Sequence, residues 1–355
     1  MENKQEFTLK NIENKKDWNS FVNENDFSFY SFLQSWEWWE VQKDLWKDIV
    51  RFWIFDQNTQ IWSMLCIKIR AKRGNYIFIP HGPLVIDTMD FYNVFHDVLP
   101  ELIKLWLKEW FDFIRCNSSQ INTKINQKNF LNLWFRDAPM HEHVEDTHLL
   151  DITISEEDLL SNMKKWDRYY INRAIKEWVI IEIGNSKKQR DILTIMHTKH
   201  SNRQNGKATY SGFSEKFIDS IYKNFWDAIT TISASHEWQV ESILMTIRFW
   251  KMCVYYIAAS DIKHPKFSPN YLCQWEAIKK AKSDWCSVYN FWWVSPDDNP
   301  NHPIAGVTKF KRKFAGSDYS LLHAQDYVLS NKYWLNYLIE TIRRKKRWYY
   351  YKKPI

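Results

Sequence analysis

The chain has 355 residues, 45% of them hydrophobic, and a formal net charge of +7 at pH 7. This length predicts about two domains. No run of about 18 apolar residues occurs, and the polar N-terminus is unlike a signal peptide, so we expect neither a membrane span nor secretion. Five cysteines without a C-x-x-C pair indicate neither a disulfide framework nor a zinc ribbon, which fits a cytoplasmic protein.

The first 148 residues alternate between helical and strand-like patterns. Helices are predicted for "KDWNSFVNEN", "SFLQSWEWWEVQKDL" and "FYNVFHDVLPELIKLWLKEW". Strands are predicted for "DIVRFWIFD", "IWSMLCIKIRA", "NYIFIPHGPLVI" and "FDFIRCN". This alternation is typical of the α/β or mixed α+β class.

A second unit begins near "THLLDITISEEDLLSNM", where Ser155 and Asp158 resemble a helix-capping box. Helices and strands alternate here as well, and no exact internal repeat is visible. The predicted helices are "EEDLLSNMKKWDRYYINRAIKE" and those around 191–199, 214–231, 271–283 and 331–347. The predicted strands are "VIIEIG", 240–249, 252–260 and 286–291.

The positive charge is concentrated at the C-terminus. The segment from Arg343 to Ile355 has seven basic residues and no acidic one, and the rest of the chain has 42 of each sign. Such a patch suits the phosphates of a nucleic acid or an anionic membrane surface. A solvated tail without a partner is the alternative.

Glycine is abnormally scarce. The chain has 7 glycines and 21 tryptophans, where an average composition would give about 25 glycines. Trp178 and Trp285 follow amphipathic helices, and Trp238 and Trp250 separate strand-like segments, all positions that favour glycine. A tryptophan-rich core or a carbohydrate-binding surface is the alternative, but these tryptophans follow the turns and not a helical or strand period.

A genetic code that reads UGA as glycine would explain this pattern, because a common translation table reads UGA as tryptophan. Fourteen such replacements would leave 21 glycines and 7 tryptophans, an ordinary composition. The bulky side chains of the literal sequence would each cost roughly 1–3 kcal/mol in packed sites. We predict glycine first at Trp39, Trp46, Trp166, Trp178, Trp238, Trp250, Trp285, Trp292 and Trp293, and with weaker support at Trp53, Trp62, Trp110, Trp134 and Trp226.

Familiar cofactor-binding loops are absent from the sequence. It has no G-x-G-x-x-G, no Walker A loop, and no Gln/Arg-x-x-Gly-x-Gly loop of the kind that holds coenzyme A in ordinary acetyltransferases. His141, His143 and His148 form a loose cluster. The cluster is either a metal site or, in our preferred interpretation, a group of solvent-exposed side chains. We therefore predict no metal and no bound cofactor.

Five motifs in order resemble the FemABX family of bacterial aminoacyltransferases, which build peptidoglycan cross-bridges. With glycines restored they read "FLQSWEWGEVQK", "IPHGPLV", "THLLDITISEEDLLSNMKKGDRYYINRAIKEGV", "YLCQWEAIKKAKSDGCSVYNFGGV" and "GVTKFKRKFAGS". The resemblance runs from about Phe32 to Gly316. His81 stands where the family commonly has Arg, and Asn290 where it has Asp, so substrate specificity is in question at both positions.

The resemblance implies two acetyltransferase-like (GNAT-like) domains with mixed sheets, a substrate groove between them, and no long helical hairpin. We expect residues 1–148 with 318–355 in the first domain and 149–317 in the second. The implied reaction moves an amino acid from aminoacyl-tRNA, a co-substrate, to an amine of the peptidoglycan stem peptide. The implied acceptor is UDP-MurNAc-pentapeptide or lipid II, reached in the cytoplasm or at the inner face of the membrane, where the basic tail would contact tRNA or lipid.

The resemblance also assigns residues. Lys311 in "TKFKRKF" is expected to be the cation near the developing oxyanion, with Phe310 beside the donor; a strand of alternating solvated lysines is the alternative. Arg203 and Lys43 are expected to bind precursor phosphates, with plain surface charge as the alternative. The other predicted substrate-binding residues are Tyr210, Tyr256 and Arg168, the last with a structural role as its alternative.

Two other functions stay open. An enzyme of the same fold could use acyl-CoA, although the missing coenzyme A loop argues against it. Alternatively, the chain could be a non-catalytic module that binds a cell-wall precursor or tRNA.

Overall fold

The computed structural model describes residues 7–354 except 13, 28, 57–58, 87–89, 205–212 and 347–350. The chain divides into two compact units, Met1–Glu145 with Ser320–Ile355, and Asp146–Tyr319. The domain boundaries expected from the sequence lie within three residues of these. No helix among the described residues has both the length and the hydropathy that a membrane span requires.

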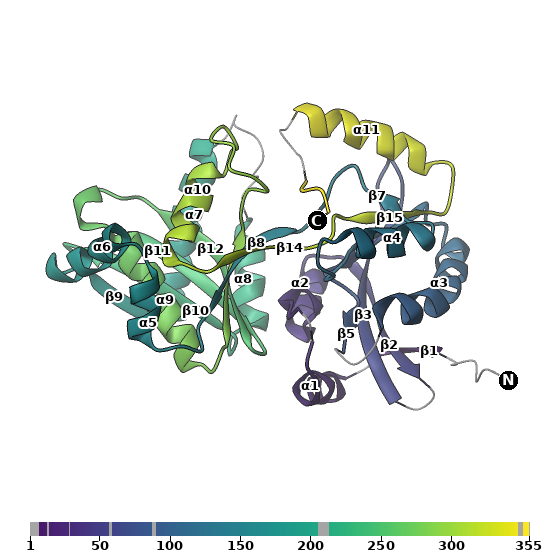
Figure 1. Ribbon diagram of the computed structural model, residues 1–355, viewed down its shortest axis with the longest axis horizontal. Coiled ribbons are helices and arrows are strands. Elements are labelled where there is room, and N and C mark those ends of the chain that lie inside the picture. Colours follow the sequence, from purple (N-terminus) through teal and green to yellow (C-terminus); the bar gives the residue numbers. More distant parts are fainter. Residues whose placement is uncertain are drawn as a thin grey trace. The chain divides into compact units, whose positions relative to one another are not determined.

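Unit 1 contains a mixed sheet with the strand order β1-β2-β3-β4-β6-β15-β7, in which β5 also pairs with β3 (Figure 1). Its core lies between this sheet and helices α3 and α4. The strands are β1 (Phe7–Asn11), β2 (Asp48–Asp56), β3 (Thr59–Ile69), β4 (Tyr76–Pro80), β5 (Leu84–Val85), β6 (Phe113–Asn117), β7 (Arg136–Asp137) and β15 (Gln325–Val328). The helices are α1 (Lys15–Glu24), α2 (Trp36–Asp44), α3 (Phe91–Lys108), α4 (Lys124–Asn132) and α11 (Tyr333–Lys346).

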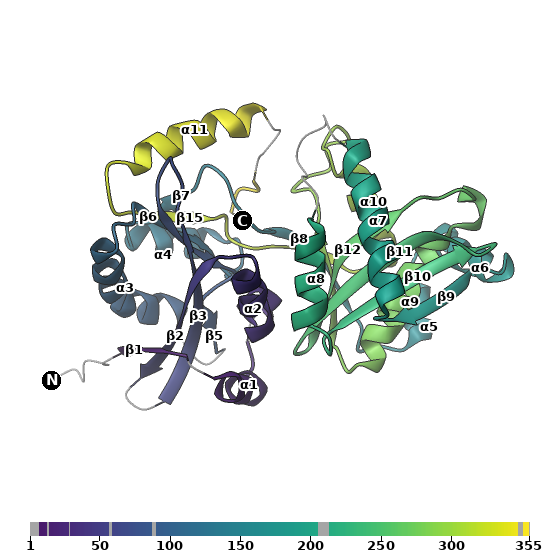
Figure 2. The same cartoon turned by 180° about the vertical axis from the view of Figure 1, so that it is seen from behind.

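Unit 2 contains a second mixed sheet with the order β14-β8-β13-β12-β11-β10-β9. Helix α9 covers one face of this sheet, and α7 and α8 cover the other, as the opposite views of Figures 1 and 2 show. The strands are β8 (Asp146–Asp151), β9 (Ile180–Gly184), β10 (Ile229–His236), β11 (Gln239–Phe249), β12 (Met252–Ser260), β13 (Val288–Trp293) and β14 (Ser317–Ser320). The helices are α5 (Glu156–Asn162), α6 (Lys165–Lys176), α7 (Lys187–Gln204), α8 (Glu215–Asn224), α9 (Pro269–Ser283) and α10 (Ala305–Lys311).

The two units repeat one plan. Each runs strand, two helices, three antiparallel strands, a helix, a parallel strand, a helix and an edge strand. The parallel pair is β4 with β6 in unit 1 and β12 with β13 in unit 2. In each sheet, the strand beside the edge strand comes from outside this run: β15 fills that place in unit 1, and β8 fills it in unit 2. The units are therefore two GNAT-like domains: unit 1 takes β15 from the C-terminal end of the chain, and unit 2 takes β8 from the segment that precedes its own run.

Tryptophans occupy left-handed backbone positions throughout the chain. Among the described residues, eight of the twelve non-glycine residues with positive φ are tryptophans. For a bulky side chain this conformation is an outlier. The eight are Trp46, Trp110, Trp134, Trp178, Trp238, Trp250, Trp285 and Trp292.

Five of these tryptophans end helices in the same way. Each amide bonds to the carbonyl three residues earlier, and the next amide bonds to the carbonyl five residues earlier, with N···O distances of 2.9–3.2 Å. This is the Schellman motif, whose left-handed position is usually glycine. The side chains are 83–92% exposed and so contribute little packing in return. The five are Trp46, Trp110, Trp134, Trp178 and Trp285.

Two more stand in two-residue hairpin turns. Glu237 and Trp238 join β10 to β11 with φ of 47° and 66°, and positive φ at both positions is the signature of a type I′ turn. Trp250, with φ 54°, is the first residue of the turn from β11 to β12. A type I′ turn favours glycine at its second central position, where Trp238 stands, and a type II′ turn favours glycine at its first central position, which has the positive φ seen at Trp250.

Other tryptophans proposed as glycine lack this signature. Trp62 is fully buried in the core of unit 1, and its ring stacks on Phe91 at 5.1 Å. Trp39 is also fully buried, with its ring 4.6 Å from that of Trp18. Backbone conformation therefore supports glycine at eight of the fourteen positions, and packing supports tryptophan at Trp62.

Replacing Trp178 or Trp285 by glycine should raise the free energy of unfolding by about 1 kcal/mol each, because glycine removes the strain of a left-handed Cβ. Trp62→Gly, the control, should lower it by 3 kcal/mol or more, since it empties a packed site. Urea unfolding of the three variants measures both effects. Loss of stability in Trp178→Gly and Trp285→Gly would contradict the glycine assignment.

Candidate functional site: a buried lysine beside a strand bulge

Strand β13 contains a bulge at the two adjacent tryptophans. Its register with β8 shifts between Asn290 and Trp293, and Trp292 has a φ of 60°. The Asn290 side-chain oxygen accepts the Trp292 amide at 2.8 Å. The Thr147 hydroxyl donates to the same Asn290 oxygen and lies 3.2 Å from the Trp292 carbonyl. Asn290 thus shapes the bulge, a role that the sequence did not reveal.

Lys311 reaches this bulge from the end of α10. Its Nζ donates to the Trp293 carbonyl at 2.7 Å and lies 5.4 Å from the centre of the Tyr255 ring. The Thr308 hydroxyl oxygen accepts the Ser295 amide at 2.9 Å, which ties α10 to the loop that follows β13. The helix therefore aims Lys311 at the bulge carbonyl.

Burial changes the acid–base behaviour of Lys311. The residue is 5% exposed, and desolvation lowers its pKa from the ordinary 10.5 to about 7. At neutral pH the amine is therefore present in both its protonated and its neutral form, whereas the sequence predicted a cation near the developing oxyanion. The interpretation of this segment as a strand with solvated lysines is wrong, because residues 305–314 are helical and Lys311 is buried.

Phe310 packs into the core of unit 2. Its ring lies 5.3 Å from Tyr271 and 5.4 Å from Phe314. These contacts fix the last turn of α10 against α9 and so hold Lys311 in place. That Phe310 also packs beside the donor stays a prediction.

Tyr256 lies on the other side of the sheet from Lys311. Its ring is 6.0 Å from Trp292 and 5.5 Å from Phe213, whereas the neighbouring Tyr255 faces Lys311. This follows from the alternation of side chains along β12. The sequence did not single out Tyr255, which contacts Lys311, and a substrate-binding role for Tyr256 stays a prediction.

Arg168 has a structural position. Its Nη1 donates to the carbonyls of Leu160, Ser161 and Met163 at 3.1, 2.9 and 2.6 Å, at the C-terminal end of α5. A cation is favourable there because the helix dipole is negative at that end. The structural alternative for Arg168 thus accounts for the whole of its observed contacts.

The remaining predicted substrate-binding residues are Arg203, Tyr210 and Lys43. Arg203 lies in α7, but its side chain and the whole of Tyr210 fall outside the described residues. Lys43 belongs to unit 1, where its half-exposed side chain pairs with Glu40 at 2.9 Å. The phosphate-binding roles of Arg203 and Lys43 therefore stay predictions.

The three clustered histidines are largely buried, and each has partners of its own. His141 pairs with Glu145, with its side chain 8% exposed. Burial lowers the pKa of His143 to about 3, and its ring stacks on Phe78 at 5.3 Å. His148, in unit 2, pairs with Asp318 at 2.7 Å. The expectation of solvent-exposed histidines is therefore wrong.

His81, one of the two departures from the family pattern, is also buried. Its Nδ1 lies 3.0 Å from the Ser31 hydroxyl, and its Nε2 lies 2.6 Å from the Val144 carbonyl, to which it donates. Burial lowers the pKa of His81 to about 4, so the ring is neutral at physiological pH. These contacts give it a structural role in unit 1.

The fold and site place the chain among tandem GNAT-like proteins. A tandem GNAT protein from the clavulanic acid biosynthesis pathway matches with a TM-score of 0.56 and 6% identity, over 92% of this chain and 99% of the other. The model of the FemAB family matches residues 185–335, a range that includes the bulge and Lys311. No curated protein sequence matches.

Other solved structures share the fold over nearly the whole chain. FemX superposes with a TM-score of 0.79 at 13% identity, covering 94% of this chain and 100% of FemX. L-PGS from Bacillus licheniformis superposes with a TM-score of 0.54 at 13% identity, covering 93% and 97%. At these identities the likeness establishes the tandem GNAT-like fold.

The depressed pKa of Lys311 predicts a pH dependence of stability. Between about pH 7 and pH 10 the unfolded chain holds a proton on Lys311 that the folded protein has lost, so stability rises with pH over this window. In Lys311→Met this contribution is absent. The free energy of unfolding of the unmutated protein, relative to Lys311→Met, should therefore rise by about 2 kcal/mol between pH 7 and pH 9.

Urea unfolding at pH 6, 7, 8 and 9 measures this difference. Lys309→Met removes an exposed lysine of the same helix and controls for the loss of one basic side chain. Parallel pH profiles for the unmutated protein and Lys311→Met would show that Lys311 keeps its proton in the folded state.

Proposed function

We propose that this chain is an aminoacyltransferase that moves an amino acid from aminoacyl-tRNA to an amine of a peptidoglycan precursor. The observation that carries the proposal is the buried Lys311 on the bulge carbonyl, within the segment that the FemAB family model matches. The superposition on FemX over 94% of the chain supports the same activity. UDP-MurNAc-pentapeptide and lipid II are the two acceptors that the proposal allows.

The proposed reaction requires two proton transfers, and the proposal includes no cofactor. The neutral acceptor amine attacks the ester carbon, a tetrahedral oxyanion forms, and the C–O bond to the ribose breaks. The nitrogen must lose a proton and the ribose oxygen must gain one. With a pKa of about 7, the Lys311 amine can accept the first proton and return it to the leaving oxygen. While protonated, it stabilises the oxyanion.

The acyl-CoA alternative is less well supported. The connection from β12 to α9, residues 261–268, reads "DIKHPKFS" and has no glycine. A loop that wraps a pyrophosphate needs backbone amides free of side-chain obstruction, which is the usual reason for glycine there. Turnover with acyl-CoA in the absence of tRNA would favour this alternative.

We also propose that the natural protein has glycine at Trp292 and at the seven other left-handed tryptophans. The Trp292 side chain is 9% exposed and occupies the space beside Tyr256. Glycine at this position would free that space and let a substrate approach the backbone of the bulge. The UGA codons that this proposal requires can be read directly from the gene.

We propose that helix α11 is the surface through which the protein contacts the inner face of the membrane. Leu335, Leu338 and Ile342 are 52%, 58% and 48% exposed and follow one stripe of the helix. The opposite stripe is fixed to unit 1, where Glu340 pairs with Arg115 at 2.8 Å. Exposed basic residues follow at the end of the helix. An apolar stripe beside cations is the pattern of a helix that lies on an anionic lipid surface.

Lys311→Met should lower the rate of transfer by about 100-fold, because it removes the proton relay and keeps the volume of the side chain. The assay uses the glycine-restored protein, a mixture of aminoacylated tRNAs, and both precursor forms. Lys309→Met, on the exposed side of α10, is the matched control and should keep full activity. Equal activity of the two variants would remove Lys311 from the mechanism, and no amide product with any pair would refute the transferase.

Leu338→Glu in α11 should weaken binding to vesicles of phosphatidylglycerol by about tenfold, because it places a charge in the apolar stripe. Leu107→Glu changes a leucine of similar exposure in α3 and should bind as the unmutated protein does. Cosedimentation with vesicles of phosphatidylglycerol and of phosphatidylcholine measures the effect. Binding that is the same for both lipids and both variants would contradict a membrane role for α11.

A further inference from the structure

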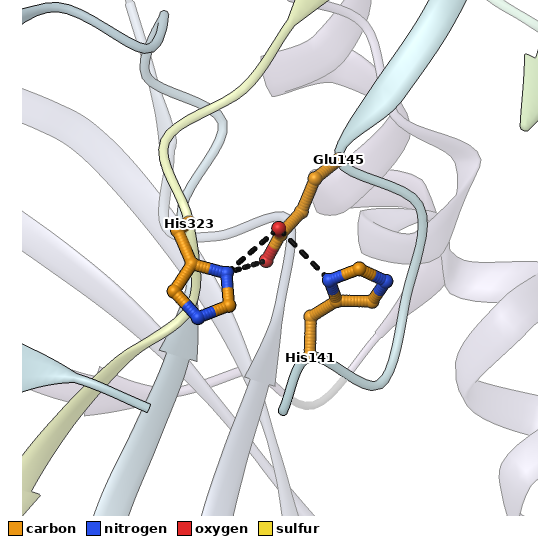
Figure 3. A group of neighbouring side chains, drawn as sticks. All are labelled: His141, Glu145 and His323. Atoms are coloured by element: carbon orange, nitrogen blue, oxygen red, sulfur yellow. Dashed lines mark hydrogen bonds and ion pairs between the residues drawn. The ribbon is translucent and has the colours of Figure 1, made fainter. Parts of the chain in front are cut away.

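A buried cluster in unit 1 brings two imidazoles onto one carboxylate (Figure 3). The Nδ1 atoms of His323 and His141 lie 2.8 and 2.9 Å from Oε2 of Glu145. The three side chains are only 3–8% exposed. Both rings thus present the same type of nitrogen to the same oxygen.

The neighbours of His323 and Glu145 fix the hydrogen-bonding roles of these two residues. The Nε2 of His323 lies 2.8 Å from the Ala138 carbonyl, which can only accept, so this nitrogen carries the hydrogen. Oε1 of Glu145 accepts the Ala324 amide at 2.7 Å and the Asn117 side-chain amide at 3.2 Å. What remains for the centre of the cluster is Oε2 and the two Nδ1 atoms.

This is how proteins prepare metal ligands. A ligating histidine almost always donates its other N–H to a carbonyl or carboxylate, and ligating carboxylates are hydrogen-bonded in turn. Two histidines and one glutamate form a known ligand set for zinc, which leaves a fourth position open. The ligand atoms of His141, Glu145 and His323 all lie within 4.8 Å of one another. Bonds of about 2.1 Å to a central tetrahedral ion would need each nitrogen and the Glu145 oxygen to move apart from hydrogen-bond distance by about half an ångström.

We propose that His141, Glu145 and His323 bind one divalent transition-metal ion, of which zinc fits the ligands best. The ion holds two distant segments of unit 1 together, since Glu145 and His323 are 178 residues apart in sequence. The proposal assigns the ion no part in the transfer reaction and is independent of the proposed function.

The position of the cluster explains what the ion would stabilise. Glu145 is the last residue before the chain leaves unit 1, and Ser320 is the first after it returns. The Leu321 amide donates to the Glu145 carbonyl at 2.8 Å, so the outgoing and returning segments already touch. His323 follows two residues later and leads into β15. An ion here would link the outgoing and returning segments beside β15, the strand that the C-terminal segment adds to the sheet of unit 1.

A second histidine cluster, in unit 2, provides an internal control. His236, Glu237 and His264 also lie close enough to share an ion. However, His264 Nδ1 is already paired with the fully buried Glu241 at 2.5 Å, and Glu237 is an exposed turn residue. This second cluster therefore lacks the prepared, buried ligand set of the first.

The experiment titrates zinc into metal-stripped protein by calorimetry and follows cobalt binding by visible absorption. The unmutated protein should bind one equivalent and gain thermal stability from zinc. His141→Gln, a change at the least buried ligand, should weaken binding at least tenfold and abolish the gain. His264→Gln should behave as the unmutated protein does. No saturable binding of one equivalent, or equal binding by His141→Gln, would overturn the proposal and leave an ion-paired triad.

A second measurement needs no variant and covers the case in which His141→Gln fails to fold. X-ray absorption at the zinc edge of the loaded, unmutated protein should show two imidazoles and oxygen in the first coordination shell. Sulfur ligands or a single imidazole would place the ion elsewhere and overturn the assignment.

Discussion

The architecture depends on left-handed backbone at the ends of its helices. After each of the five Schellman motifs a strand begins within three residues: β2 after Trp46, β6 after Trp110, β7 after Trp134, β9 after Trp178 and β13 after Trp285. A chain that failed to turn there would continue the helix or enter the sheet out of register. Because both units use this device, one conformational constraint sets the connections of both sheets. A bulky side chain at these positions adds strain without adding contacts.

The same constraint builds the candidate site. The left-handed conformation of Trp292 creates the bulge in β13, and the bulge turns the Trp293 carbonyl to the Lys311 amine. Desolvation of that amine follows from packing of α10 against the core, in which Phe310 and Phe314 take part. The lowered pKa of Lys311 therefore depends on the packing of α10, and the position of its hydrogen-bond acceptor depends on the bulge in β13. Bulges commonly re-aim groups at functional sites in this way.

Local patterns predicted some elements closely and no long-range pairing. They missed β10 (Ile229–His236), whose first residues fell in a helix expected at 214–231. The helix expected at 271–283 is α9 (Pro269–Ser283), and the strand expected at 240–249 is β11 (Gln239–Phe249). The lysine-rich "KFKRKF" alternates as a strand would, but it is helical because its phenylalanines pack against Tyr271 and each other. Burial of Lys311 could not be foreseen, since it depends on residues brought together by the sheet. The repeat of one plan in two units was equally hidden, because strand order leaves no periodic signal in a single sequence.

Unit 1 depends on a strand from the C-terminal segment of the chain. Strand β15 carries Asp326, whose carboxylate pairs in bidentate fashion with the fully buried Arg115 of β6 at 2.8 Å. Residues 1–145 alone would bury that guanidinium without its main partner, and breaking a buried pair in this way costs about 3–5 kcal/mol. Unit 1 therefore needs the C-terminal segment, which reaches it only after unit 2 has been traversed. Unit 1 is thus complete only once the chain beyond unit 2 has been synthesised, whereas unit 2 is one continuous segment that contains all of its own strands.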